Sequence, residues 1–178
     1  VITPSFPAYL RYLEALKLAG ETSRWTDVRH LCARALEFDP DFASAWILIS
    51  ATYVNENRPD SATVALREAR RSVNRLTPAE KAHLEALDAT IRRDFKAAAR
   101  ICQAALRGQL SLGDRANWYN SLGYALDQIG DQENALEAYA AANRGRRFSS
   151  ASSRRAPLIP PPAPGNPRGA IRPPPGRR

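Results

Sequence analysis

The chain has 178 residues, of which 44% are hydrophobic, and a formal net charge of +8 that is unevenly distributed. Residues 144–178 contain nine Arg, nine Pro and no acidic residue. Removing these nine positive charges leaves −1 for residues 1–143, which argues against that part being a basic domain for specific nucleic-acid recognition. We therefore expect one folded domain over residues 1–143 and a Pro/Arg-rich disordered tail over residues 144–178.

Two missing signals limit where the chain is expected to act. No run approaches the ~18 consecutive apolar residues of a membrane span, and no charged segment followed by an apolar one marks a signal peptide. Cys32 and Cys102 lie far apart in sequence and are poor candidates for a disulfide, which fits a reducing compartment such as the cytoplasm. Since the chain opens at Val1 and contains no Met, we expect it to be part of a longer protein.

The first two helices are expected at residues 8–20 and about 24–38. The large apolar residues of the first helix fall largely on one face: Leu10, Leu13, Leu16 and Leu18. The second helix should bury a stripe formed by Trp25, Val28, Leu31, Cys32, Ala35 and Leu36. Pro40 then ends this pair, and Asp41 is placed to cap the next helix.

The next two helix pairs repeat this arrangement with clearer boundaries. In the second pair, a turn at residues 57–59 separates two helices with matched positions Trp46, Ser50 and Tyr53, then Ala62, Leu66 and Ala69. The third pair begins at a capping box, in which Thr77 accepts from the Glu80 amide and Glu80 accepts from the Thr77 amide. Its matched positions are Ala86, Phe95, Ala98, Cys102 and Ala105.

Residues 117–142 form the clearest unit, with two amphipathic helices on either side of Gly130. This glycine is expected to adopt a left-handed conformation and end the first helix. Small residues stand where the two helices must cross closely, Gly123 in the first and Ala135 in the second. Apolar residues recur at helical spacing: Tyr119, Leu122, Leu126, Leu136 and Tyr139.

This pattern closely resembles the tetratricopeptide repeat (TPR), a helix-turn-helix unit of about 34 residues with spaced aromatic, Leu, Gly and Ala positions. The matched positions Val28 and Ala62 are 34 residues apart, and the segment ALEFDPDFA is similar to the junction between two such repeats. The resemblance implies an all-α, right-handed α-solenoid of about four units. The step from Ala98 to Ala135 is longer, at 37 residues, so we expect the third and fourth units to depart from a regular superhelix.

In the TPR family, the first helices of the units line a concave surface that generally holds a peptide or a segment of a partner protein. The resemblance places a peptide-binding groove at Ser44, Ile47, Ala51, Asn55, His83, Leu87, Thr90, Asn117, Asn120, Tyr124 and Gln128. Members that clamp the C-terminal carboxylate of chaperones place Lys and Arg beside Asn, and these cations are missing here. The alternative for Asn120 and Tyr124 is a solvated helix face without a ligand.

Two functions remain open. The leading one is a protein–protein interaction scaffold. The other is a regulatory or sensory segment of a larger signalling protein, with another domain of that protein as its partner. The phrases PSFPAYLRYLEAL and LTPAEKAHLEAL resemble repeat regions attached to bacterial protein kinases and winged-helix transcription regulators.

Residues suited to catalysis or metal binding are few. His30 and Cys32 are about 200° apart around a helix, so they cannot readily serve one metal ion. Cys32 and Cys102 occupy equivalent apolar positions and are expected to be buried. Residues 108–113 mimic the spacing of a phosphate-binding loop, but Asp114 stands where a lysine is needed. We expect no catalytic residue, no metal and no cofactor.

The tail permits several interpretations. Two runs of three prolines, at residues 160–162 and 173–175, favour polyproline II and would suit an SH3-type partner. The clustered Arg residues would suit nonspecific contact with RNA or a membrane surface. A disordered tail without a partner is the simpler interpretation. A sequence outside the native reading frame is a further alternative, because the repeat pattern stops abruptly after Ala142.

Overall fold

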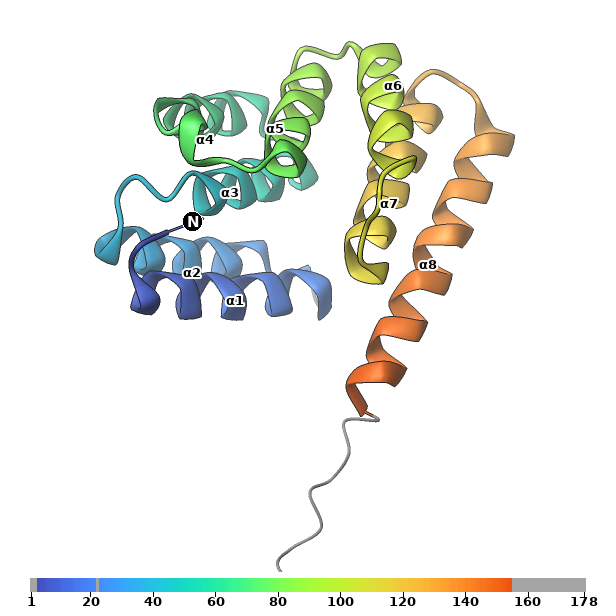
Figure 1. The fold of residues 1–178 in the computed structure, drawn as a ribbon. Coiled ribbons are helices and arrows are strands. Elements are labelled where there is room, and N and C mark those ends of the chain that lie inside the picture. Colours follow the sequence, from blue (N-terminus) through green and yellow to red (C-terminus); the bar gives the residue numbers. More distant parts are fainter. Residues whose placement is uncertain (1–2, 22, 155–178) are drawn as a thin grey trace, which may run out of the picture.

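The computed structural model describes residues 3–21 and 23–154, and the regular structure in these ranges is entirely helical (Figure 1). This confirms the all-α class. The helices are α1 (Phe6–Glu21), α2 (Trp25–Phe38), α3 (Ala43–Asn55), α4 (Pro59–Arg71), α5 (Pro78–Ile91), α6 (Phe95–Leu106), α7 (Leu112–Gln128) and α8 (Gln132–Arg154), with a 3₁₀ turn, η1 (Val73–Arg75), between α4 and α5.

Each helix packs against the next one along the chain, and α3 packs against α5 as well. In Figure 1, α1 to α4 run across the view, α6 to α8 stand upright beside them, and α5 lies between the two groups. The boundary expected at residue 143 falls inside α8, which continues to Arg154. The remainder of the expected tail, residues 155–178, lies outside the described residues.

Small residues allow close helix crossings, as the sequence pattern predicted. Ala62 and Ala135 are both buried, with relative exposures of 0% and 2%. The hydroxyl of Ser50 in α3 donates to the carbonyl oxygen of Ala62 in α4 at 3.0 Å, which joins the two helices where they approach. The backbones can come this close only because neither position carries a large side chain.

Most of the predicted helix boundaries are confirmed. Thr77 and Glu80 form the expected capping box at the start of α5. Gly130 has a φ of 84°, the left-handed conformation that favours glycine. The expectation that Asp41 caps α3 is wrong, because Phe42 holds the cap position and makes no side-chain capping bond. The amide of Asp41 instead donates to the Asp39 carboxylate.

The buried faces of α1 and α8 are made of smaller residues than the sequence pattern suggested. In α1, Ala8 and Ala15 are buried, whereas Leu10, Leu13 and Leu16 are 39–43% exposed. In α8, Ala135, Ala138 and Ala142 are buried, and Leu136 is 70% exposed. The leucines that recur at helical spacing in these two helices therefore lie largely outside the core. The neighbouring helix lies close to each alanine face, and that leaves the leucines on the solvent side.

Candidate partner-binding surfaces

The four expected groove residues of α7 are all exposed and lie along one face of the helix. Steps of three and four residues separate Asn117, Asn120, Tyr124 and Gln128, so their side chains follow one another along the helix axis. The ring of Tyr124 meets the ring of Phe95 in α6 edge to face, with centroids 6.0 Å apart. This contact orients an aromatic side chain that is still 38% exposed.

The three expected groove residues of α5 are only partly open. The imidazole of His83 stacks on the buried indole of Trp118, with ring centroids 4.0 Å apart and an interplanar angle of 16°. Leu87 packs against the core cluster that contains Leu84, and the Thr90 hydroxyl donates to the carbonyl of Ala86. His83 therefore connects α5 to α7, and Leu87 and Thr90 are half-buried beside it.

The groove residues expected on α3 divide into buried and open ones. Ser44 and Ile47 are buried. The Ser44 hydroxyl donates to Glu80 Oε1 at 2.5 Å, and Ile47 belongs to the core cluster between α3, α4 and α5. These two side chains hold helices together, so they are not available to a ligand. Ala51 is half-buried, and Asn55 is exposed near the end of α3.

Two carboxylates that the groove prediction did not include act on His83 through their charge. Burial lowers the pKa of His83, while the nearby charges of Asp114 and Glu80 raise it. Burial is the main cause that raises the pKa of Tyr12 in α1, and the charges of the same two carboxylates raise it further. We name Tyr12, Glu80, His83, Asp114 and Trp118 the inner cluster; it brings together residues from α1, α5 and α7.

Both carboxylates of the inner cluster also stabilise helix starts. Glu80 accepts from the Thr77 amide, and Asp114 accepts from the hydroxyl of Ser111, which in turn caps α7. Among the described residues, neither Glu80 nor Asp114 forms an ion pair with a cation. The capping box in the sequence pointed to Glu80, whereas the cap formed by Ser111 and Asp114 was not predicted.

A cleft of about 380 Å³ opens on the opposite face of α3, between α2 and α4. Its apolar lining includes Ala33, Leu36, Trp46, Ile49, Val64 and Ala65, and none of the expected groove residues contributes to it. Arg29 lies at its edge, where it pairs with Glu56 at 3.0 Å and stacks over the Tyr53 ring at 4.5 Å. The guanidinium is therefore already engaged within the protein.

The two cysteines are buried in separate helices, as the sequence predicted. Burial raises the pKa of each thiol, Cys32 and Cys102, to about 12. Both thiols therefore remain protonated near neutral pH. Within residues 3–21 and 23–154, no three His, Cys, Asp or Glu side chains are grouped to hold a metal ion. None of the described helices has the length and apolar character needed to cross a membrane.

No model of a known protein family matches this chain, and a search of curated proteins finds no match either.

Proposed function

We propose that this chain is a protein–protein interaction scaffold of the TPR type. Its eight helices would form four units of a right-handed solenoid, and its activity would be binding rather than catalysis. The open face of α7 carries the proposal, because it presents three amides and a tyrosine in one line on the helix that also carries Asp114 and Trp118. The concave surface formed by the first helices of the units would hold a peptide or a segment of a partner protein.

The chemistry of this surface indicates the kind of peptide that it fits. Asn117, Asn120 and Gln128 offer neutral donors and acceptors for a peptide backbone, and Tyr124 offers a fixed aromatic ring. Glu80 and Asp114 add negative charge next to these groups, and no described cation pairs with them. A peptide with a basic side chain near an apolar one would therefore match the surface better than an acidic C-terminus.

Selection from a random peptide library, followed by affinity measurement on purified variants, tests this proposal. The binding variant combines Asn117→Ala, Asn120→Ala and Tyr124→Ala. The matched control combines Asn74→Ala, Gln103→Ala and Phe38→Ala, which are also two amides and one aromatic side chain on exposed positions. His83 stays unchanged, because its stacking on Trp118 supports the fold.

Two lost hydrogen bonds of ~0.5–1.5 kcal/mol each, together with an aromatic anchor, should weaken peptide binding by roughly two orders of magnitude or more. The control should bind like the unaltered chain. Peptides that bind the α7 variant as tightly as the unaltered chain would show that the binding surface lies elsewhere.

The alternative function, a regulatory or sensory segment of a bacterial kinase or transcription regulator, is favoured by one observation. The outer face of α1 exposes five large apolar side chains: Phe6, Tyr9, Leu10, Leu13 and Leu16. Another domain of the same polypeptide would be expected to cover such a stripe. Thiol labelling of a Leu10→Cys variant tests this, since the residue should react in the isolated chain and be protected in the longer protein.

A further inference from the structure

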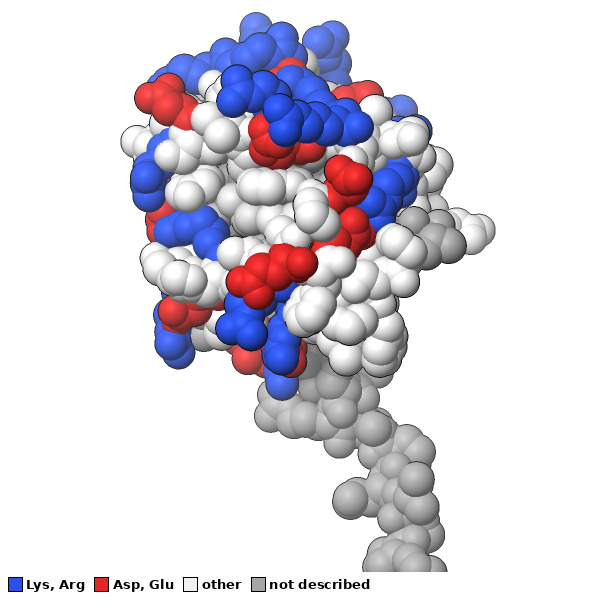
Figure 2. Space-filling view, turned by 90° about the vertical axis from the view of Figure 1, so that its left-hand side faces the viewer, with Lys and Arg blue, Asp and Glu red and all other residues white. Residues whose placement is uncertain are grey.

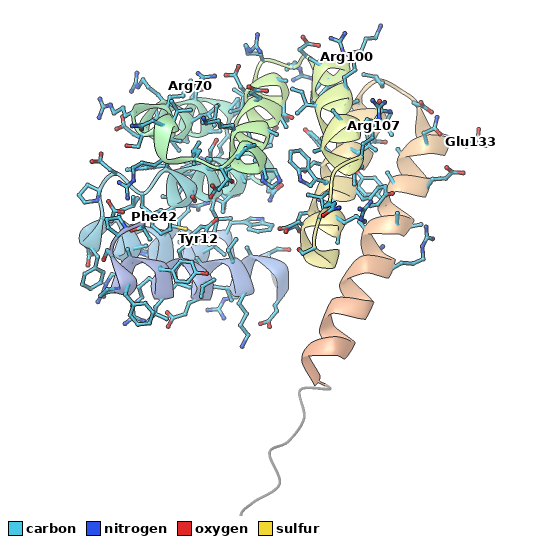
Figure 3. The ribbon with its side chains drawn as sticks, viewed as in Figure 1. Tyr12, Phe42, Arg70, Arg100, Arg107 and Glu133 are labelled. Carbon is cyan, nitrogen blue, oxygen red and sulfur yellow. The ribbon has the colours of Figure 1, made fainter. Side chains whose placement is uncertain are left out.

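A dense group of cations covers the C-terminal end of α4 and the turn between α5 and α6. Figure 2 shows Lys and Arg side chains gathered along the upper edge of the molecule, and Figure 3 places Arg70 and Arg100 at that edge. We name this group the basic surface. All seven of its cations are exposed: Arg67, Arg70, Arg71, Arg92, Arg93, Lys96 and Arg100.

Packing between helices brings these cations together. The Asp88 carboxylate in α5 accepts from Arg70 in α4 at 2.7 Å and from Arg92 at 3.0 Å, so one acid connects two helices. The guanidinium of Arg93 lies over the Phe95 ring at 5.8 Å. The shared carboxylate of Asp88 therefore holds the guanidinium groups of Arg70 and Arg92 near one another.

The basic surface keeps a large excess of positive charge. Its seven cations are accompanied by three carboxylates on the same segments, Glu68, Asp88 and Asp94, which leaves a formal charge of +4. Residues 1–143 as a whole sum to −1. The fold therefore concentrates positive charge on the basic surface, although the net charge of residues 1–143 is close to zero. A local field of this kind attracts anionic partners and accelerates their encounter.

We propose that the basic surface binds the phosphate backbone of a nucleic acid without reading its sequence. Six of the seven cations are Arg, whose planar guanidinium donates two parallel hydrogen bonds to a phosphate. The cations lie along the upper edge of the molecule in Figure 2, and none of the seven lines the apolar cleft described above. No exposed aromatic or Leu side chain lies on its described segments to enter a membrane interface.

The test measures binding of the full chain to a fluorescent 20-base-pair DNA duplex over a series of salt concentrations. The surface variant combines Arg93→Gln, Lys96→Gln and Arg100→Gln, which form no ion pair among the described residues. The control combines Lys17→Gln, Lys81→Gln and Arg107→Gln, which are exposed outside the basic surface. Both variants lose three positive charges and keep the same Arg-rich segment after residue 144.

Each phosphate contact contributes about 0.9 to the slope of log affinity against log salt, so loss of three contacts should reduce that slope by about 2.7 and affinity roughly tenfold or more. The control should keep the slope of the unaltered chain. Equal weakening of the two variants would overturn the proposal, since total charge or the C-terminal segment would then suffice. It would also be overturned if poly-glutamate or phosphatidylserine vesicles, and not the duplex, bound in a manner that depends on these three residues.

Discussion

The ring of Tyr139 in α8 occupies the space that a side chain at Gly123 in α7 would require. A Cβ atom at position 123 would lie 2.8 Å from Tyr139 Cδ1 and 2.9 Å from Cε1. These distances are shorter than those at which a Cβ atom contacts a non-bonded carbon atom. The glycine therefore allows α7 and α8 to pack through an aromatic ring. The sequence pattern placed a close crossing here, and the structure identifies the group that fills it.

Replacement of Gly123 by Ala should destabilise the fold by about 1–3 kcal/mol, because the added methyl overlaps a ring held between two helices. This loss exceeds the roughly 0.5–1 kcal/mol by which Ala stabilises the interior of a helix relative to Gly. Thermal unfolding followed by circular dichroism measures the difference. Gly20→Ala is the matched control, since no atom lies within 4 Å of its added Cβ. A Gly123→Ala protein that melts at or above the temperature of the control would contradict the assigned packing.

The alanine positions at the helix crossings should resist enlargement in the same way. Ala62→Leu or Ala135→Leu should cost ~1–3 kcal/mol, because both side chains are buried where helices approach closely. Ala140 is exposed on α8, so Ala140→Leu should change stability far less. Chemical denaturation gives the three free energies of unfolding. Similar values for all three variants would show that the buried face of α4 or α8 has been assigned incorrectly.

Stability should fall in acid through the buried carboxylate of Asp39. Its Oδ1 accepts from Arg75 Nη1 at 3.1 Å, and its Oδ2 accepts from the Thr3 hydroxyl. The hydrogen bonds from Arg75 are the main cause that lowers the pKa of Asp39, and burial opposes them. A carboxyl group whose pKa is lower in the folded chain binds protons more readily when unfolded. The contribution of Asp39 to the free energy of unfolding is therefore complete above the ordinary Asp pKa of about 3.9. It is lost as the pH falls through the lower pKa of the folded chain.

Asp39→Asn should lower the free energy of unfolding by ~1–3 kcal/mol at pH 7. This is the range for a buried charged group that loses its hydrogen-bond partner. Urea unfolding at pH 7 and at pH 3 should show a smaller difference between the variant and the unaltered chain in acid. The exposed pair of Arg34 and Glu37 provides the control, since Glu37→Gln should change stability little at either pH. An Asp39→Asn protein with unchanged stability at pH 7 would rule out the proposed role of this carboxylate.

The two thiols should be unreactive in the folded chain. Burial raises the pKa of Cys32 and Cys102 to about 12, so almost no thiolate is present at pH 8. A thiol reagent added at pH 8 should label neither cysteine until urea unfolds the protein, and then both. Rapid labelling of the folded chain would mean that one of these helices opens readily or that a thiol is activated.

Local spacing in the sequence was sufficient to predict the helices and most of their ends. The capping box at Thr77 and the left-handed turn at Gly130 depend on residues within one helical turn, so each is visible without the fold. The small residues Gly123 and Ala135 marked close crossings, because only small side chains let two helix backbones approach closely. The conformation of such short segments follows mainly from their own hydrogen bonds and backbone geometry.

The tertiary structure decided which apolar face of a helix is buried and which distant charges become neighbours. Leu10 and Leu136 have the spacing of core residues, yet α1 and α8 bury their alanine faces, because a neighbouring helix approaches closest there. Asp88 in α5 pairs with Arg70 in α4, which is distant in sequence, and the charges of Glu80 and Asp114 both act on His83. Burial and electrostatic fields depend on distances between helices, and the helical period of a single segment contains no information about those distances.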